Sequence, residues 1–207
     1  MTPSIRLDGV RFRYPGGFAL GPIDLQLEAG LWHLQGHNGS GKTTLLRLLT
    51  GALAPSTGTL TVCGAAPHDS PSTRARVGWL PANPDLPDFF EVDEAWQFMA
   101  ALRGRPDWDG SDLCAQLQLP GRLRLSSCSA GQRRKAELVA ALAADPPVLL
   151  LDEPFANVDV AAVDIIRGWL RAWSRTRLVL LVTHEPPGLD VSGRFELRDG
   201  ALVASAA

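Results

Sequence analysis

Hydrophobic and polar residues alternate near the start of the chain, in the pattern of half-buried strands. Residues 5–14 alternate weakly and are rich in strand-forming residues, and residues 20–27 alternate again after a turn at Pro15-Gly16-Gly17. These two segments predict an antiparallel hairpin. The hairpin leads into a short apolar run, residues 31–35, which predicts a buried strand.

Further along the chain, short apolar runs alternate with longer segments of helical periodicity. Strands are expected at residues 59–63, 77–80, 148–153 and 178–182, with a terminal hairpin at 195–203. Helices are expected from residue 45 onward and at residues 91–103, 112–119, 133–144 and 160–174. Residues 64–73 are expected to form a loop. Uninterrupted apolar strands are typical of a parallel sheet covered on both faces, so the pattern predicts an α/β fold.

A glycine-rich segment separates the strand at 31–35 from the helix that follows. Its residues are Gly36, His37, Asn38, Gly39, Ser40, Gly41, Lys42, Thr43 and Thr44. They fit G-x-x-x-x-G-K-[ST], in which backbone N–H groups and a helix N-terminus surround phosphate. Lys42 would add a charge near the β- and γ-phosphates, and the Thr43 hydroxyl would bind Mg²⁺. The strand before the segment and the helix after it are the context that this motif requires.

Polar side chains follow two later apolar strands. Asp152 and Glu153 end one strand, and His184 follows another. Because ligands bind at the carboxyl ends of parallel strands, Asp152 is predicted to hold Mg²⁺ and Glu153 to orient and deprotonate a water. His184 is predicted to take part at the same edge. Tyr14, in the first turn, is a candidate for stacking on an adenine, with Phe12 and Phe18 as rivals.

The helix expected near residue 133 follows Ser129-Ala130-Gly131-Gln132. Ser129 is a favourable N-cap, and its small neighbours leave backbone N–H groups accessible, so this helix start predicts a second anion site. A well-capped helix with no ligand is the alternative. The basic triplet of residues 133–135 is interpreted as a solvated helix face.

Composition narrows the classes of function. The chain has 207 residues and a net charge of −2, which offers no global attraction for nucleic acid, and no nucleic-acid partner is expected. Three scattered cysteines favour a reducing compartment over a disulfide framework. The first 30 residues carry charges throughout, unlike a signal peptide, and the apolar runs are too short to cross a bilayer. Any membrane-spanning part is therefore expected in another chain.

Taken together, these motifs resemble those of the ATP-binding subunits of ABC transporters over nearly the whole chain. Residues 36–43 resemble the Walker A motif, and residues 149–152 resemble Walker B, followed by Glu153 as the catalytic glutamate. Ser129 to Gln132 is similar to the signature motif. The resemblance implies an α/β P-loop NTPase core of mostly parallel sheet. To this core it adds an N-terminal antiparallel β subdomain and a small inserted helical subdomain.

The resemblance also assigns residues outside the Walker motifs. Residues 157–159 resemble the D-loop, which makes Asp159 a nucleotide-site residue, and His184 resembles the switch histidine. Ser129, Gly131 and Gln132 would contact ATP bound by another copy. Tyr14 is similar to the adenine-stacking aromatic.

The implied protein is an ATPase with the cofactors ATP and Mg²⁺, in a single domain of residues 1–207 with a helical insert at about 84–145. Two copies, expected to form a homodimer, would close head to tail on ATP and drive a separate membrane permease. The location implied is the cytoplasmic face of the inner membrane. Export is the expected direction, and the haem exporter of cytochrome c maturation is one similar system.

The sequence departs from the family pattern at Ala82, where glutamine is usual, and at Cys128 and Ala130 of the signature motif. Alanine cannot coordinate Mg²⁺ or position water, and the neighbouring Asn83 has a shorter reach. One alternative follows from Ala82: a module that dimerises on ATP with little turnover. A separate alternative, for which the sequence offers little, is a soluble ABC-type ATPase unconnected with transport.

Overall fold

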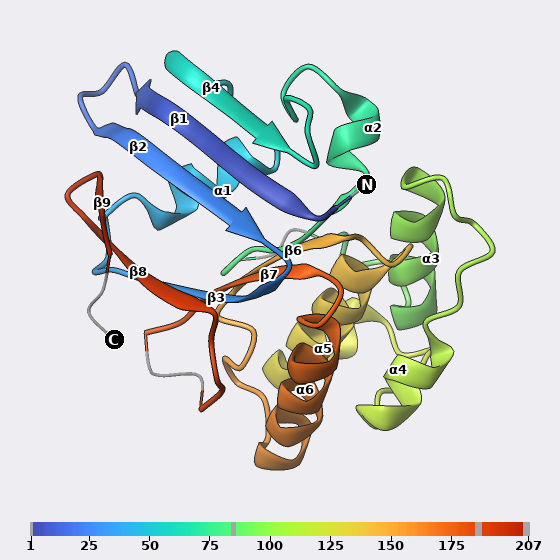
Figure 1. Cartoon of the computed structure of the whole chain (residues 1–207). Coiled ribbons are helices and arrows are strands. Elements are labelled where there is room, and N and C mark those ends of the chain that lie inside the picture. The colour runs from blue at the N-terminus through green and yellow to red at the C-terminus, as the bar shows by residue number, and fades with distance from the viewer. Residues whose placement is uncertain (1, 84–85, 185–187, 205–207) are drawn as a thin grey trace.

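The computed structural model describes residues 2–83, 86–184 and 188–204. Two sheets form its framework (Figure 1). The smaller sheet is antiparallel, in the order β2-β1-β4, and its strands are β1 (Ser4–Arg13), β2 (Ala19–Glu28) and β4 (Thr57–Val62). The predicted hairpin of the first two strands is confirmed, and the strand expected at 59–63 completes the sheet by pairing with β1.

The larger sheet has the order β5-β6-β7-β3-β8-β9. Its strands are β3 (Gly30–Gln35), β5 (Val77–Leu80), β6 (Val148–Asp152), β7 (Leu178–Val182), β8 (Gly193–Arg198) and β9 (Ala201–Ala204). The first five in this order are parallel, and β9 pairs antiparallel with β8, which confirms the terminal hairpin. Leu34 of β3 and Asp152 of β6 both pair with Val182 of β7, so the loops after these strands begin at one edge of the sheet.

The described helices are α1 (Lys42–Leu49), α2 (Pro71–Arg74), α3 (Val92–Leu102), α4 (Ser111–Gln116), α5 (Ala130–Leu142) and α6 (Val160–Trp173), with a 3₁₀ turn at Leu125–Ser127. Helix α1 packs between the two sheets, whereas α5 and α6 cover the opposite face of the larger sheet and α3 packs beside α5 (Figure 1). Within the described residues, no helix has both the length and the apolar composition that a membrane span requires.

Strand β6 shows why the sequence specifies two cores. Its side chains point alternately to the two faces of the sheet, so Leu149 and Leu151 join the helical core while Val148 and Leu150 join the core around α1. All four residues are fully buried. This confirms the expectation that an uninterrupted apolar run marks a parallel strand covered on both sides.

Two expectations about local structure were wrong. Residues 64–73 were expected to be a loop, but α2 begins at Pro71, because Ser70 accepts a hydrogen bond from the Thr73 N–H and proline suits the first helical position. Helix α5 begins at Ala130 rather than at residue 133, directly after its cap Ser129. The small residues of that segment are compatible with the first helical turn once the cap is in place.

Candidate functional site

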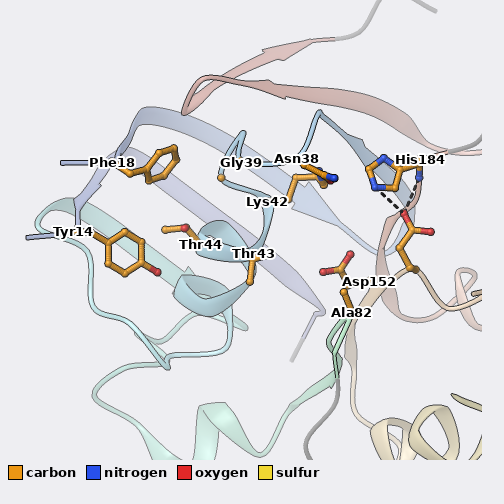
Figure 2. A pocket seen from close by; sticks show the side chains of 12 residues that line it. Tyr14, Phe18, Asn38, Gly39, Lys42, Thr43, Thr44, Ala82, Asp152 and His184 are labelled. Atoms are coloured by element: carbon orange, nitrogen blue, oxygen red, sulfur yellow. Dashed lines mark hydrogen bonds and ion pairs between the residues drawn. The ribbon is translucent and has the colours of Figure 1, made fainter. Parts of the chain in front are cut away.

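A cleft of about 410 Å³ opens at the edge of the larger sheet where β3, β6 and β7 end (Figure 2). Its lining is Tyr14, Phe18, Asn38, Gly39, Gly41, Lys42, Thr43, Thr44, Ala82, Asp152, Glu153 and His184. These residues come from segments far apart in the sequence. The structure therefore brings most of the predicted Walker A residues together with both predicted acids, the predicted histidine and Tyr14.

The glycine-rich loop follows β3 and runs into the first turn of α1. Gly41 caps α1 in the left-handed region, with φ of 109°, and a side chain there would lie 2.8 Å from the Phe18 ring. A Cβ at Gly36 would lie 2.5 Å from the Leu197 carbonyl oxygen. Glycine is therefore required at both positions, for the backbone conformation and for the close approach of neighbouring groups. Gly36, His37 and the buried Ser40 belong to the loop but do not line the cleft.

Lys42 is held along the loop. Its Nζ donates to the carbonyl oxygens of Gly36, at 2.6 Å, and His37, at 3.0 Å. Burial lowers the pKa of Lys42, while the nearby carboxylates of Asp152 and Glu153 act in the opposite direction. The charged amine therefore lies between the loop and the two acids, where an anion such as phosphate would be attracted.

Asp152 ends β6 and is buried. Burial raises the pKa of its carboxyl group, and the neighbouring Glu153 adds to the rise, against the opposing effects of Lys42 and Arg134. The Thr43 hydroxyl and the Asp152 carboxylate line the same cleft and are the oxygen donors that Mg²⁺ prefers. Among the described residues, no group of three or more His, Cys, Asp or Glu side chains is arranged to hold a metal ion.

Glu153 is held in an unusual conformation beside His184. Its φ is +51°, in the left-handed region that non-glycine residues rarely adopt. Its Oε1 accepts a hydrogen bond of 2.8 Å from the His184 backbone N–H and lies 3.8 Å from His184 Nε2 (Figure 2). A strained backbone conformation persists only where the surrounding structure maintains it, and such residues are concentrated at functional sites.

Two aromatic rings line the cleft near the phosphate loop. Tyr14 and Phe18 are both partly exposed there, while Phe12 packs edge-on against Tyr14 with ring centroids 4.8 Å apart. Phe12 packs against the Tyr14 ring and does not line the cleft, so Phe18 is the remaining rival of Tyr14 for contact with a base. Stacking on adenine stays a prediction for Tyr14.

Ala82 lines the cleft and has no polar side chain. The Ala82 N–H acts on the Asp152 carboxyl group in the direction that lowers its pKa, against the larger effect of burial. Asn83, which sequence reasoning offered as a substitute for the usual glutamine, does not line the cleft.

The residues of the predicted signature motif lie outside this cleft. Ser129 and Gln132 form a reciprocal cap, in which Ser129 Oγ accepts from the Gln132 N–H and Gln132 Oε1 accepts from the Ser129 N–H. Gly131 packs closely on the backbone of Asn157. Asp159 caps α6 through the Ala162 N–H, and its Oδ2 lies 3.1 Å from Lys135 Nζ. Contact of Ser129, Gly131, Gln132 and Asp159 with a nucleotide stays a prediction.

The interpretation of residues 133–135 as a solvated helix face was wrong. Arg134 and Lys135 are buried, and the Arg134 guanidinium reaches the backbone of Asp152 and Glu153. The sequence held a signal for this burial. Positions three, four and seven residues along a helix share a face, and Leu138 and Ala141 follow Arg134 at four and seven residues.

The fold and the cleft define a nucleotide-binding protein of the P-loop class, with a lysine loop and two acids at the carboxyl end of a parallel sheet. A family model described as ABC transporter matches residues 20–156, and the chain belongs to that family. It is an ATP-binding subunit of an ABC transporter, an ATPase coupled to transport. ATPase subunits of this kind work with permease partners.

Three relatives show the breadth of the family. The lipoprotein-releasing system ATP-binding protein LolD of Anaeromyxobacter dehalogenans is 36% identical, over 98% of this chain and 94% of that protein. The Nod factor export ATP-binding protein I of Cupriavidus metallidurans is 32% identical, over 89% and 64%. The sulfate/thiosulfate import ATP-binding protein CysA of Mycobacterium bovis is 35% identical, over 94% and 58%. The chain thus spans less than two thirds of the length of the last two.

A solved structure described as the ATP-binding subunit of an ABC transporter superposes with a TM-score of 0.84. It is 20% identical and covers 97% of this chain and 89% of its own. At this identity the likeness concerns the fold, and it confirms the predicted α/β P-loop architecture.

Proposed function

We propose that this chain, as a single ATP-binding domain, hydrolyses Mg-ATP at the interface of a head-to-tail homodimer and drives a separate permease at the cytoplasmic face of the membrane. The observation that supports this most is the division of the predicted site. Lys42, Asp152 and Glu153 share one cleft, whereas Ser129 and Gly131 lie outside it. A second copy could therefore complete the site with its own signature helix.

Each group in the cleft has a distinct task. Lys42 and the loop N–H groups bind the β- and γ-phosphates, and Thr43 and Asp152 hold Mg²⁺, which neutralises charge on the phosphate oxygens when bound. Glu153 orients the attacking water and accepts its proton. The His184 N–H holds the Glu153 carboxylate at 2.8 Å and thereby sets its direction. Ser129 Oγ is the acceptor in its cap, so its hydroxyl hydrogen is not used by that bond.

Direction and cargo are proposed only broadly. The names of two relatives describe lipoprotein release and Nod factor export, and that of a third describes sulfate import. We favour export, because of these three relatives the one that the chain covers most fully belongs to a releasing system. The haem exporter remains one candidate system among several.

The test of the proposed base is Glu153→Gln, which keeps the shape of the side chain and removes its basicity. Steady-state hydrolysis of Mg-ATP is expected to fall at least about 100-fold, the scale of a general base, while ATP binding is retained. Glu28→Gln, an exposed residue of β2, is the matched control and should keep wild-type turnover. Unchanged turnover in Glu153→Gln would remove Glu153 from the base role.

The dimer is tested in the same variant. Light scattering of Glu153→Gln should show a dimer with Mg-ATP and a monomer without it, and Ser129→Ala should weaken the dimer. A monomer at saturating ATP would contradict the head-to-tail arrangement.

A second candidate function, a module that closes on ATP with little turnover, is favoured by Ala82, which has no polar side chain to place water. ATP-dependent dimerisation with negligible wild-type hydrolysis would select it. Rapid steady-state turnover would exclude it.

A further inference from the structure

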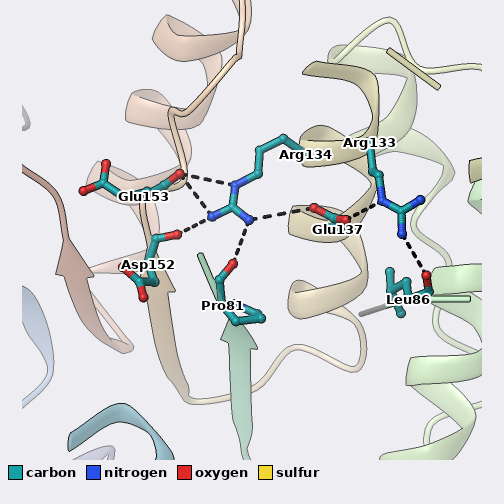
Figure 3. Close-up of polar contacts among 7 residues, drawn as sticks. All are labelled: Pro81, Leu86, Arg133, Arg134, Glu137, Asp152 and Glu153. Carbon is teal, nitrogen blue, oxygen red and sulfur yellow. Dashed lines mark hydrogen bonds and ion pairs between the residues drawn. The ribbon is translucent and has the colours of Figure 1, made fainter. Parts of the chain in front are cut away.

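The guanidinium of Arg134 joins three elements behind the cleft. Arg134 lies on the first turns of α5 and is 5% exposed. Its Nη1 donates to the Pro81 carbonyl oxygen at 2.7 Å, its Nη2 donates to the carbonyl oxygen of Asp152, and its Nε donates to that of Glu153 at 3.2 Å (Figure 3). One buried side chain thus binds the ends of β5 and β6 to the helix that carries the signature motif.

The peptide between Pro81 and Ala82 is held on both sides. Its carbonyl oxygen accepts from Arg134, and its N–H lies close enough to the Asp152 carboxyl group to act against the rise of that group's pKa. A peptide group is planar, so fixing the carbonyl oxygen also fixes the direction of the N–H. Through this peptide, Arg134 sets where the Asp152 carboxylate is held, at the position where Ala82 offers no polar side chain.

Arg134 also holds the main chain of Glu153. Both Nε and Nη2 of Arg134 contact the Glu153 carbonyl oxygen, at 3.2 and 3.1 Å. Glu153 has a positive φ, a conformation that persists only where surrounding contacts maintain it. The same residue directs its carboxylate toward His184 through the 2.8 Å hydrogen bond. The contacts on the Glu153 carbonyl therefore help to decide the direction of its side chain.

Glu137 and Arg133 anchor this arrangement. Glu137 Oε2 lies 3.8 Å from Arg134 Nη1, and its Oε1 accepts from Arg133 Nε at 3.0 Å. Arg133 also donates to the Leu86 carbonyl oxygen at 2.8 Å (Figure 3). It donates to the Asp88 carboxylate as well. Burial lowers the pKa of Arg134 and raises that of Glu137. Desolvation therefore destabilises the charged form of each group, and the hydrogen bonds and ion pair described above offset this destabilisation.

We propose that Arg134 is a positioning residue for ATP hydrolysis, which holds the Pro81–Ala82 peptide and the main chain of Glu153 so that the two cleft carboxylates keep their reactive geometry. The proposal rests on the proposed roles of Asp152 and Glu153. Arg134 lines no part of the cleft, so its effect is expected on turnover rather than on binding.

Arg103, the C-cap residue of α3, is a matched control that contacts the other end of α5. Its guanidinium also clamps main-chain carbonyls, those of Ala140, Ala141 and Ala143, and burial lowers its pKa to about 10. Arg103→Gln and Arg134→Gln therefore both remove a guanidinium that donates to several main-chain carbonyls, although Arg103 is only half-buried. Both should lower the melting temperature, because each leaves buried carbonyls without their donor.

The decisive measurement is the steady-state kinetics of the full chain with Mg-ATP. Arg134→Gln should lower kcat at least about tenfold with KM within about twofold, and Arg103→Gln should keep kcat within about twofold. Arg134→Lys keeps the charge but cannot reach three carbonyls at once, so its kcat should lie between wild type and Arg134→Gln. If Arg134→Gln does not fold, Arg134→Lys carries the same comparison, with at least about a threefold loss of kcat.

Two outcomes would overturn the proposal. The first is a kcat of the Arg134 variants within twofold of wild type. The second is an equal fall in kcat for Arg103→Gln, which would make the effect one of stability. Glu153→Gln is measured in parallel: turnover retained in that variant rejects the proposed base, whereas turnover lost there but normal in Arg134→Gln rejects only the role of Arg134.

Discussion

The close contact between Gly131 and Asn157 makes a stability experiment possible on the first turn of α5. In Gly131→Ala, the new methyl group would lie 2.5 Å from the Asn157 carbonyl oxygen. A Cβ essentially never comes within 3.0 Å of another heavy atom, so the backbone of residue 157 or the start of α5 must move. The obstacle is main chain rather than the end of a flexible side chain, which makes the shift costly.

The size of the effect follows from two opposing contributions. Overpacking of this kind costs about 1–3 kcal/mol. Replacing glycine by alanine in a helix contributes up to about 1 kcal/mol of stability. Gly168, in α6, isolates the second contribution, because a Cβ there would have no neighbour within 4 Å. We therefore expect Gly168→Ala to be more stable than wild type and Gly131→Ala to be about 1–3 kcal/mol less stable than Gly168→Ala.

The assay is urea unfolding without nucleotide, followed by the fluorescence of the six tryptophans. With a slope of about 2 kcal/mol per molar urea, the two midpoints should differ by about 0.5–1.5 M. Equal midpoints, or a higher midpoint for Gly131→Ala, would refute the reasoning, because the methyl group would then be accommodated without cost.

Two further predictions concern His33 and the aromatic rings of the cleft. Burial lowers the pKa of His33 from its ordinary 6.5, so the unfolded chain takes up the proton first and stability should fall as the pH drops below 6.5, by at most about 1.4 kcal/mol per pH unit. Urea titrations at several pH values should show a smaller fall in His33→Gln than in His37→Gln, and an equal fall would contradict the prediction. Tyr14→Ala should weaken ATP binding at least about fivefold and leave tripolyphosphate binding unchanged, because a stacked base contributes about 1 kcal/mol or more. A greater loss of ATP affinity in Phe18→Ala would assign the adenine to Phe18.

Local sequence was sufficient for the features that depend on near neighbours. The lysine loop could be recognised because its glycines, Lys42 and Thr43 act within one turn between a strand and a helix. The strand ending in Asp152 could be recognised because continuous burial on both faces requires an uninterrupted apolar run. The parallel order of such strands then placed Asp152, Glu153 and His184 at one edge, as expected.

Other features depended on segments that meet only in the folded chain. Arg134 shares a helix face with Leu138 and Ala141, which indicates its burial, but nothing in the sequence shows that carbonyl groups from residues 81, 152 and 153 converge on it. The Ala82 N–H could serve Asp152 only because β5 and β6 are neighbours in the sheet. A motif records which groups a short stretch can offer. Tertiary packing decides which backbone groups form hydrogen bonds with a buried charge. Such partners lie far apart in the sequence, so the periodicity of the sequence does not reveal them.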